Sequence, residues 1–383
     1  MSPDAARLQV AQGRLRICLL CVEIFAWGKY GGFGRATRTI GRELVRAGHD
    51  VTAIVPRRNG QSERETLDGI RVLSYPAHWP WAIYRLAKLV DADIYHSCEP
   101  SFASYMARLA RRERRHVVTV RDPRTLGDWR IELNLPSINK MQVAMNFLFE
   151  HNALVTLAVR KADAVFTAYR DAIPKVRQLY GLSRPPQFLP TPVRIPENPR
   201  KESRPVVCYI GRLDRRKRPH LLIPVARQFP EVEFLVAGSS RDKGWESSLL
   251  NELSSLPNVR ILGFVDQFRS PLHSEILERS WIFLNTAERE GLPNSFIEAA
   301  AHGCAILSSN DPDGFASRFG EHVVGGDFAT GLQRLLADHR WERLGNAARS
   351  YVSSTFASET AIASHLDAYR AVLSGQKVAF AAP

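Results

Sequence analysis

Two glutamates in the segment 286–307, Glu290 and Glu298, are the best candidates for holding a polar ligand. An apolar run at 281–284 precedes them and indicates a buried strand that ends in a Glu-Gly and Pro-Asn turn. The pattern then predicts a short helix over 294–302. Glu290 therefore falls in the loop at the carboxyl end of a strand, and Glu298 falls one turn inside the helix. Carboxylates in these positions can accept hydrogen bonds from hydroxyl groups, such as those of a sugar.

The helix itself offers a second explanation for Glu298. We expect Asn294 or Ser295 to cap its start and Gly303 to close its end. With Ser295 as the cap, Ser-Phe-Ile-Glu is a capping box, and Glu298 then needs no ligand. The sequence leaves both explanations open.

A second cluster follows the apolar strand predicted at 205–210. Gly211 ends that strand, Arg212 can fork onto two phosphate oxygens, and Lys217 adds a point charge from the next turn. The alternative is that Arg212 and Lys217 pair with surface acids. The neighbouring cations are interpreted as surface charges: Arg215, Arg216 and Arg218.

A glycine loop in the first half has the layout of a phosphate-binding turn. It contains Gly31 and Gly32 and lies between an apolar strand at 15–22 and a helical pattern at 35–47. Glycine lets a backbone approach a phosphate closely, and a helix start attracts anions. The spacing is not that of a dinucleotide fingerprint, and Asp50 precedes the next strand instead of ending it. A plain tight turn is the alternative.

Apolar runs alternate with segments of helical period through most of the chain, which predicts an α/β architecture with parallel sheets. The further strands expected are 51–55, 70–75, 93–97, 116–121, 164–168, 233–237, 259–265 and 305–308. The further helices expected are 81–90, 102–112 and 357–373. Prolines crowd the span 185–205 and mark an interdomain linker.

These motifs together resemble the retaining glycosyltransferases of family 4, the glycosyl transferases group 1. The resemblance is carried by Glu-Gly-Leu-Pro-Asn…Ile-Glu-Ala-Ala-Ala-x-Gly at 290–303 and by Gly-Arg-Leu-x-x-x-Lys at 211–217. It implies the GT-B fold, in which two Rossmann-like domains turn their parallel sheets toward a deep interdomain cleft. We expect domains at 1–198 and 199–356, with a final helix in 357–383 that crosses back to the first.

The resemblance also implies an activity, the metal-independent and configuration-retaining transfer of a sugar from a nucleoside diphosphate. Arg212, Lys217 and the N–H groups after Gly291 would stabilise the leaving phosphate, while Glu290 holds the donor sugar and Glu298 its ribose. No cofactor is implied beyond the nucleotide sugar itself. The remaining positions that the resemblance assigns to substrate binding are Gly31, Gly32, His96, Asp122, Gly211, Gly263, Phe264, Val265, Leu292, Pro293 and Asn294.

One departure from the family pattern concerns the reacting face. The family commonly has Thr-x-His-Asp where this chain has Thr119-Val-Arg121-Asp122. Arg121 stays protonated and cannot act as a base, but it can donate to a sugar oxygen or a phosphate, so it stays among the catalytic candidates. Two other functions stay open. One is a GT-B isomerase or epimerase of nucleotide sugars, which would need an acid or base pair for proton abstraction. The other, which Arg121 keeps open, is a membrane-associated partner that binds a nucleotide sugar without turning it over.

The positive net charge of the chain favours an anionic partner. The chain of 383 residues carries a formal net charge of +13, which attracts polyanions. Trp79 and Trp81 with Arg85 and Lys88, and the arginine-rich run 111–115, are typical of segments that dock on anionic lipid. A solvated basic face is the alternative for the run 111–115. Aromatic and basic residues are not interleaved as for base stacking, so nucleic acid is not expected. We expect a glycan or lipid-linked acceptor.

Other features of the sequence bear on the cellular compartment, the state of the cysteines and metal binding. No stretch of about 18 uncharged apolar residues is present, and the first residues lack the layout of a signal peptide. We expect a cytoplasmic protein, peripheral at the inner membrane face. The odd number of cysteines, mostly in apolar runs, favours buried reduced thiols. Asp91-Ala-Asp93 matches a metal-binding DxD motif, but it leads into a strand, so we expect a loop and no metal.

Overall fold

Two α/β units make up the part of the chain that the computed structural model describes, residues 13–134 and 140–376. Of the described residues, unit 1 contains 13–133, 140–192 and 358–376, and unit 2 contains Val193–Ala357 together with Asn134. The chain thus passes from one unit to the other after Pro192 and after Ala357. The sequence placed these boundaries at 198/199 and 356/357.

Unit 1 is built on an eight-stranded sheet of order β3-β4-β2-β1-β5-β6-β7-β8. All neighbouring strands are parallel except the β3 and β4 pair at one edge. The strands are β1 Arg16–Leu20, β2 Asp50–Pro56, β3 Arg64–Leu67, β4 Ile70–Tyr75, β5 Ile94–Ser97, β6 Arg115–Val120, β7 Ala164–Thr167 and β8 Gln187–Phe188.

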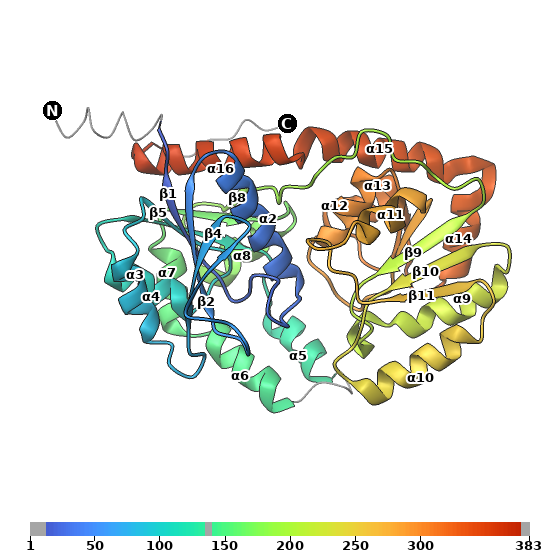
Figure 1. Ribbon diagram of the computed structural model, residues 1–383, viewed down its shortest axis with the longest axis horizontal. Helices are drawn as coiled ribbons and strands as arrows, with labels where there is room; N and C mark the ends of the chain where they lie inside the picture. The colour runs from blue at the N-terminus through green and yellow to red at the C-terminus, as the bar shows by residue number, and fades with distance from the viewer. Residues whose placement is uncertain (1–12, 135–139, 377–383) are drawn as a thin grey trace. The chain divides into compact units, whose positions relative to one another are not determined.

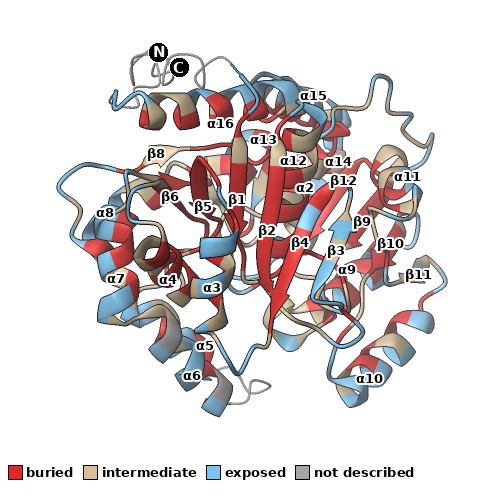
Figure 2. Cartoon of the chain, turned by 60° about the vertical axis from the view of Figure 1, so that its left-hand side comes forward, coloured by how far each residue is buried: buried red, intermediate tan, exposed pale blue. Residues whose placement is uncertain are grey.

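Helices cover both faces of this sheet. Ile17 and Leu19 of β1 pack on the side of α2 and α16, whereas Cys18 and Leu20 pack on the side of α3 and α4. Figure 2 shows the resulting burial of β1 and β2 along most of their lengths. A strand buried on both faces has apolar residues in succession, which explains why the sequence identified these strands. The helices are α2 Gly32–Arg46, α3 Ala82–Leu89, α4 Phe102–Ala110, α5 Leu126–Asn134, α6 Lys140–Glu150, α7 Ala153–Arg160, α8 Ala172–Tyr180 and α16 Ser358–Leu373.

Unit 2 has a six-stranded parallel sheet of order β11-β10-β9-β12-β13-β14, of which Figure 1 labels β9, β10 and β11. The strands are β9 Val206–Ile210, β10 Glu233–Ala237, β11 Val259–Gly263, β12 Ile282–Asn285, β13 Ala305–Ser308 and β14 Gly320–His322. The α-helices are α9 Leu222–Gln228, α10 Lys243–Ser254, α11 Leu272–Arg279, α12 Asn294–Ala301, α13 Phe315–Phe319, α14 Phe328–Leu336 and α15 Arg340–Thr355.

The parallel strands of each sheet reverse their order once, between β1 and β5 in unit 1 and between β9 and β12 in unit 2. In open α/β sheets ligands bind beyond the carboxyl ends of the strands at such a point. In unit 2, β9 ends at Ile210 and β12 ends at Asn285. The segments 211–217 and 286–298 therefore leave the sheet at the same switch point.

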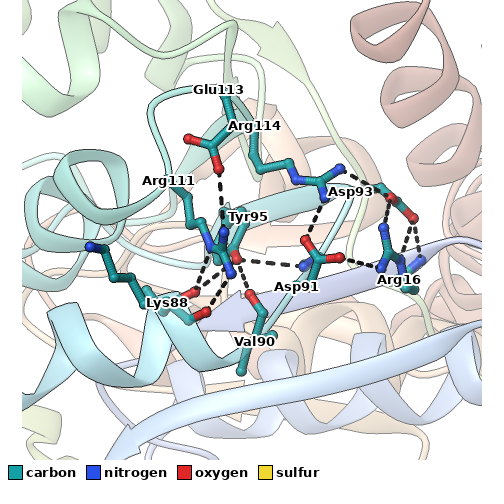
Figure 3. A network of polar contacts seen from close by, with 11 residues as sticks. Arg16, Lys88, Val90, Asp91, Asp93, Tyr95, Arg111, Glu113 and Arg114 are labelled. Atoms are coloured by element: carbon teal, nitrogen blue, oxygen red, sulfur yellow. Dashed lines mark hydrogen bonds and ion pairs between the residues drawn. The ribbon is translucent and has the colours of Figure 1, made fainter.

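The DxD sequence comes just before β5, at the amino ends of the unit 1 strands, and belongs to the polar network drawn in Figure 3. Arg16 at the start of β1 pairs with Asp91 at 2.6 Å and with Asp93 at 2.7 Å, and Arg114 pairs with Asp91 at 2.5 Å. Slight burial opposes ionisation of Asp91, but the two guanidinium groups outweigh it and hold its pKa below the ordinary value. Both aspartates thus tie the strand starts together.

All five cysteines are buried and free of disulfides, which confirms the prediction of buried reduced thiols. Over the described residues, no helix combines the length and the apolar character needed to cross a membrane. The same residues contain no cluster of three or more His, Cys, Asp or Glu arranged to hold a metal ion.

Candidate active site

Lys217 and Glu290 meet at the switch point of unit 2. Lys217 ends a short 3-10 turn, Arg215–Lys217, whose cap Asp214 accepts a hydrogen bond from the Lys217 N–H at 3.2 Å. The Lys217 ammonium forms an ion pair with the Glu290 carboxylate, and the two side chains are 22% and 17% exposed. The structure therefore joins the cationic motif after β9 to the acidic motif after β12.

Arg212 lies just before the same turn. Its Nη1 lies 3.1 Å from Asp214 Oδ2, and its side chain is about half exposed. The pairing of Arg212 with an acid, which the sequence left open, therefore occurs within its own turn. Lys217 pairs with Glu290, the acid of the second motif.

Three glycines bring neighbouring loops together at the carboxyl ends of β9, β10 and β11. Gly211 N–H donates to Ala237 O at 3.0 Å, and Gly238 N–H donates to Gly263 O at 2.7 Å. A Cβ at Gly238 would lie 1.8 Å from Gly211 O, so only glycine fits there. The segment 263–265, which the sequence assigned to substrate binding, thus begins among turns that backbone hydrogen bonds hold together, with Phe264 exposed and Val265 buried.

Arg218 braces the acidic loop, which corrects its interpretation as a surface charge. Its Nε donates to Thr286 O at 2.8 Å, its Nη1 lies 2.6 Å from Glu288 Oε2, and its Nη2 donates to Ser309 Oγ at 3.2 Å. Its backbone has a left-handed φ of +49°. This conformation costs a non-glycine residue about 1 to 2 kcal/mol, and the contacts of the side chain offset that cost.

We expect Arg218→Gly and Arg218→Ala each to lower kcat/KM for the donor about tenfold, because charge-assisted bonds of about 1.5 to 3 kcal/mol each hold the loop that carries Glu290. The glycine variant should be the more stable by about 1 kcal/mol, since glycine adopts the left-handed conformation without strain. Steady-state kinetics and denaturant unfolding measure the two effects.

Arg215→Ala is the matched control. Arg215 belongs to the same 3-10 turn, but its guanidinium lies over the Trp245 ring, 4.3 Å from the ring centroid. It should keep the donor kinetics of the native protein. If both Arg218 variants lose stability while their donor kinetics stay unchanged, Arg218 serves the scaffold alone.

Asn310 is a second brace that the sequence did not reveal. It follows β13, donates from Nδ2 to Ala287 O at 2.7 Å and accepts the Glu290 N–H at 3.1 Å. An asparagine after a strand is typical of a turn, so its residue type gave no signal of this role.

The start of α12 excludes the capping box. Pro293 is the N-cap and has no side-chain acceptor, which places Ser295 at the second helical position instead of the predicted cap. Glu298 Oε2 lies 3.4 Å from Nε2 of the buried His273 on α11. Gly303 follows the helix with φ +75°, as the sequence predicted. Gly291 and Leu292 lie half-buried in the loop before the helix.

In unit 1, His96 is a core residue. It has no exposed surface, and its ring nitrogens lie 2.7 Å from the Tyr369 hydroxyl and 2.7 Å from Thr119 Oγ1. Burial is the main cause that lowers the pKa of His96 well below its ordinary value, with the charge of Arg121 acting in the same direction. With both nitrogens engaged, the prediction that His96 binds substrate has no support in this geometry.

Arg121 is also buried, 7% exposed, at the end of β6. Its Nη1 donates to Thr191 Oγ1 at 2.8 Å, and its Nε lies 3.8 Å from Glu99 Oε1. Burial raises the pKa of Glu99 well above its ordinary value, and Arg121 opposes that rise. Asp122, next in the chain, accepts from Arg124 Nε at 3.2 Å. Arg121 thus contacts groups of its own unit, and its catalytic role stays a prediction.

The glycine loop of unit 1 accommodates a carboxylate of the chain itself. Gly34 N–H at the start of α2 donates to Glu23 Oε1 at 2.9 Å, and a Cβ at Gly31 would lie 2.0 Å from that oxygen. The anion at this helix start is Glu23, paired with Lys29 at 3.6 Å. The predicted contact of Gly31 and Gly32 with donor phosphates therefore has no support in this geometry.

A doubly wound α/β unit with a cationic turn and an acidic loop at one switch point is typical of proteins that bind nucleotides. Residues 192–354 match the family model of glycosyl transferases group 1, and residues 31–191 match that of the glycosyl transferase 4-like domain. The chain belongs to this family of glycosyltransferases, as the motifs at 211–217 and 290–303 predicted.

Curated relatives are distant. An N-acetylgalactosamine-N,N'-diacetylbacillosaminyl-diphospho-undecaprenol 4-alpha-N-acetylgalactosaminyltransferase of Campylobacter jejuni is 22% identical over 245 residues, 62% of each chain. The capsular polysaccharide biosynthesis glycosyltransferase CapH of Staphylococcus aureus is 32% identical over 123 residues, 30% of this chain and 33% of CapH. The aligned part is thus less than two thirds of either relative.

Solved structures match nearly the whole chain. Sucrose-phosphate synthase of Thermosynechococcus elongatus has a TM-score of 0.72 at 17% identity, covering 95% of this chain and 100% of that one. HepE of Anabaena, solved with UDP and glucose, has a TM-score of 0.68 at 15% identity, covering 93% and 99%. At such identities the likeness establishes the fold alone, and it confirms the predicted GT-B class of two parallel-sheet α/β domains.

Proposed function

We propose that the chain transfers a sugar from a nucleoside-diphosphate donor to a glycan or lipid-linked acceptor, with retention and without a metal, in the synthesis of a glycolipid or cell-surface polysaccharide at an anionic membrane face. The contact between Lys217 and Glu290 beside Arg212 carries the proposal. The relatives support its direction, since one is named for an undecaprenol diphosphate substrate and the other for capsular polysaccharide synthesis.

The proposed mechanism assigns charge stabilisation to the turn after β9. As the glycosidic bond breaks, negative charge grows on the leaving phosphate oxygen. A positioned donor at that oxygen lowers the barrier by about 3 to 4 kcal/mol. Arg212 and Lys217 fill this role, with Lys217 held in place by Glu290 and by the Asp214 cap. Glu290 holds donor sugar hydroxyls beside the ammonium, and the N–H groups after Gly291 face the phosphates.

Calorimetric titration of nucleotide sugars, repeated in excess EDTA, tests the donor half of the proposal. One donor should bind without a metal, and incubation with lipid-linked or glycan acceptors should release nucleoside diphosphate. Anomeric proton couplings in the product report retention. Donor binding without release would indicate a non-catalytic partner, and recovery of an isomerised donor would indicate an epimerase. Absence of binding by any nucleotide sugar would refute the proposal.

Glu298→Gln should weaken binding of the nucleoside diphosphate about tenfold, because a charged acceptor for the ribose hydroxyls becomes neutral. The free energy of unfolding should change by less than about 0.5 kcal/mol, since Glu298 takes no part in a capping box. Glu342→Gln is the control, an exposed glutamate in the first turn of α15. Unchanged affinity with reduced stability would show that Glu298 acts only within the scaffold.

A further inference from the structure

A surface on α3 and α4 of unit 1 combines exposed aromatic rings with cations. Trp79 and Trp81, at the start of α3, are 58% and 56% exposed, and Leu89 at its end is 61% exposed. We use the name aromatic-basic surface for four aromatic and four basic residues on and beside these two helices: Trp79, Trp81, Phe102 and Tyr105, with Arg85, Lys88, Arg108 and Arg112.

The rings form a continuous row across the two helices. Trp81 meets Phe102 edge-on with centroids 5.2 Å apart, and Phe102 lies 6.3 Å from Tyr105. The opposite sides of the helices are buried in the core through residues such as Ile83 and Met106. Figure 2 shows the exposed outer side of α3. The core therefore needs the inner side of α3, and it leaves the tryptophans outside.

The charges around these rings are of one sign. Neither the stretch 76–90 nor α4 contains Asp or Glu. Arg85, Lys88 and Arg112 are exposed and Arg108 is half-buried. Lys88 Nζ lies 5.0 Å from the centroid of the Tyr84 ring.

The acids that follow in sequence have cationic partners. Asp91 pairs with Arg16 and Arg114, and Glu113 pairs with Arg111 at 3.4 Å. The surface thus keeps a positive field beside its exposed rings.

We propose that the aromatic-basic surface binds an anionic lipid bilayer. Tryptophan has an apolar body and a polar N–H, so it favours the boundary between lipid headgroups and acyl chains. Arginine and lysine beside it attract lipid phosphates. The inference rests on the proposed function in one respect: an enzyme that uses a lipid-linked acceptor has a reason to bind the membrane. The acceptor would then diffuse in the same bilayer to which unit 1 binds.

The test is flotation of the full chain with vesicles of phosphatidylcholine alone or mixed with phosphatidylglycerol. The native chain should float with the mixed vesicles only, and added salt should release it because salt screens exposed charges. Tryptophan emission should shift to shorter wavelength on binding. Neither donor nor acceptor is present, so vesicle binding and donor binding fail or succeed separately.

Two double variants divide the surface into its parts. Arg85→Gln with Lys88→Gln should lower affinity for mixed vesicles at least about tenfold, and Trp79→Ser with Trp81→Ser should abolish the emission shift. The charge-matched control is Arg227→Gln with Arg260→Gln, two exposed cations of unit 2. Val324→Ser is the apolar control, at a residue 81% exposed in the same unit. Both controls should float as the native chain does.

Three results would overturn the proposal: no flotation of the native chain with mixed vesicles, native affinity in both double variants, or equal losses in the controls. Thermal melts exclude misfolding of the double variants, and expected melting points are native because the altered side chains are exposed. Tight binding of single-stranded RNA without vesicle binding would assign the surface to nucleic acid and also reject a bilayer.

Discussion

Replacement of Lys217 by alanine is expected to lower kcat about 10²- to 10³-fold. The ammonium would otherwise stabilise the charge that develops on the leaving phosphate, a stabilisation that water supplies poorly in a closed site. The same change should cost about 1 kcal/mol or less of stability, the ordinary value of an ion pair between partly exposed side chains. Turnover measured far below the melting temperature, beside denaturant unfolding, separates the two effects.

Lys243→Ala is the matched control for this prediction. Lys243 also pairs with a glutamate of unit 2, Glu246 at 2.6 Å, but it begins α10 instead of following β9. It should keep native turnover. The double variant Lys217→Ala with Glu290→Gln should lose less activity than the product of the single losses, because the two side chains are in contact. A drop in stability without a drop in kcat would remove Lys217 from the reaction.

The parallel sheets were predictable because buried parallel strands have continuous apolar runs. The bounds of β4, β10 and β13 agree with the predicted spans 70–75, 233–237 and 305–308. Three of the four edge strands were missed. The sequence of β3, Arg-Glu-Thr-Leu, alternates exposed and half-buried positions and has no apolar run, and β8 and β14 have only two and three residues. The sequence pattern therefore predicted the central strands and missed most of those at the edges.

The sequence indicated which residues belong to the candidate site, but not which of their side chains contact one another. The motifs placed Lys217 and Glu290 at strand ends, and the strand order brings these ends together across 73 positions. Arg218 escaped prediction because its neighbours Arg215 and Arg216 have the same residue type. Arg218 differs from these neighbours in its left-handed backbone and in its contacts with residues 68 to 91 positions away. The local sequence indicates neither feature.

His96 shows the converse case, in which the sequence did not reveal the contacts that the residue makes within its own unit, and its role in substrate binding stays a prediction. Its position at a strand end indicated a ligand contact, yet α16 brings Tyr369 against it from 273 positions away. The sequence predicted α16 as a helix, but helical period does not say which polar groups it covers. The same network, which includes His365, gives unit 1 a dependence on pH.

Unit 1 is expected to lose stability as pH falls from about 6.5 toward 3. His365 is 1% exposed, with Nε2 3.1 Å from Pro190 O and Nδ1 3.4 Å from the Tyr369 hydroxyl. Burial lowers its pKa to about 3; the Pro190 carbonyl opposes this shift and the charge of Arg121 reinforces it. The pKa of His96 shifts in the same direction. A histidine held neutral in the folded state contributes its full stability above its unfolded pKa, and acid removes that contribution.

The shift of His365 alone corresponds to a loss on the order of 5 kcal/mol by pH 3. Urea unfolding at a series of pH values measures it as a slope of free energy against pH. His302 in unit 2, whose pKa burial lowers to about 4, adds to the slope of the whole chain. The informative quantity is therefore the difference between the native chain and His365→Gln, which should have the flatter slope between pH 6 and 4.

His78→Gln is the control, an exposed histidine of the same unit, and it should keep the native slope. Proteolysis gives a local measure, because His365 and Tyr369 hold α16 to the rest of unit 1, and α16 should become susceptible to cleavage as His365 and His96 become protonated. The order of cleavage and global unfolding then identifies the cause of the acid sensitivity. Cleavage within 358–373 that precedes global unfolding in acid assigns the loss to this network, whereas an unchanged slope in His365→Gln would mean that the acid sensitivity arises elsewhere.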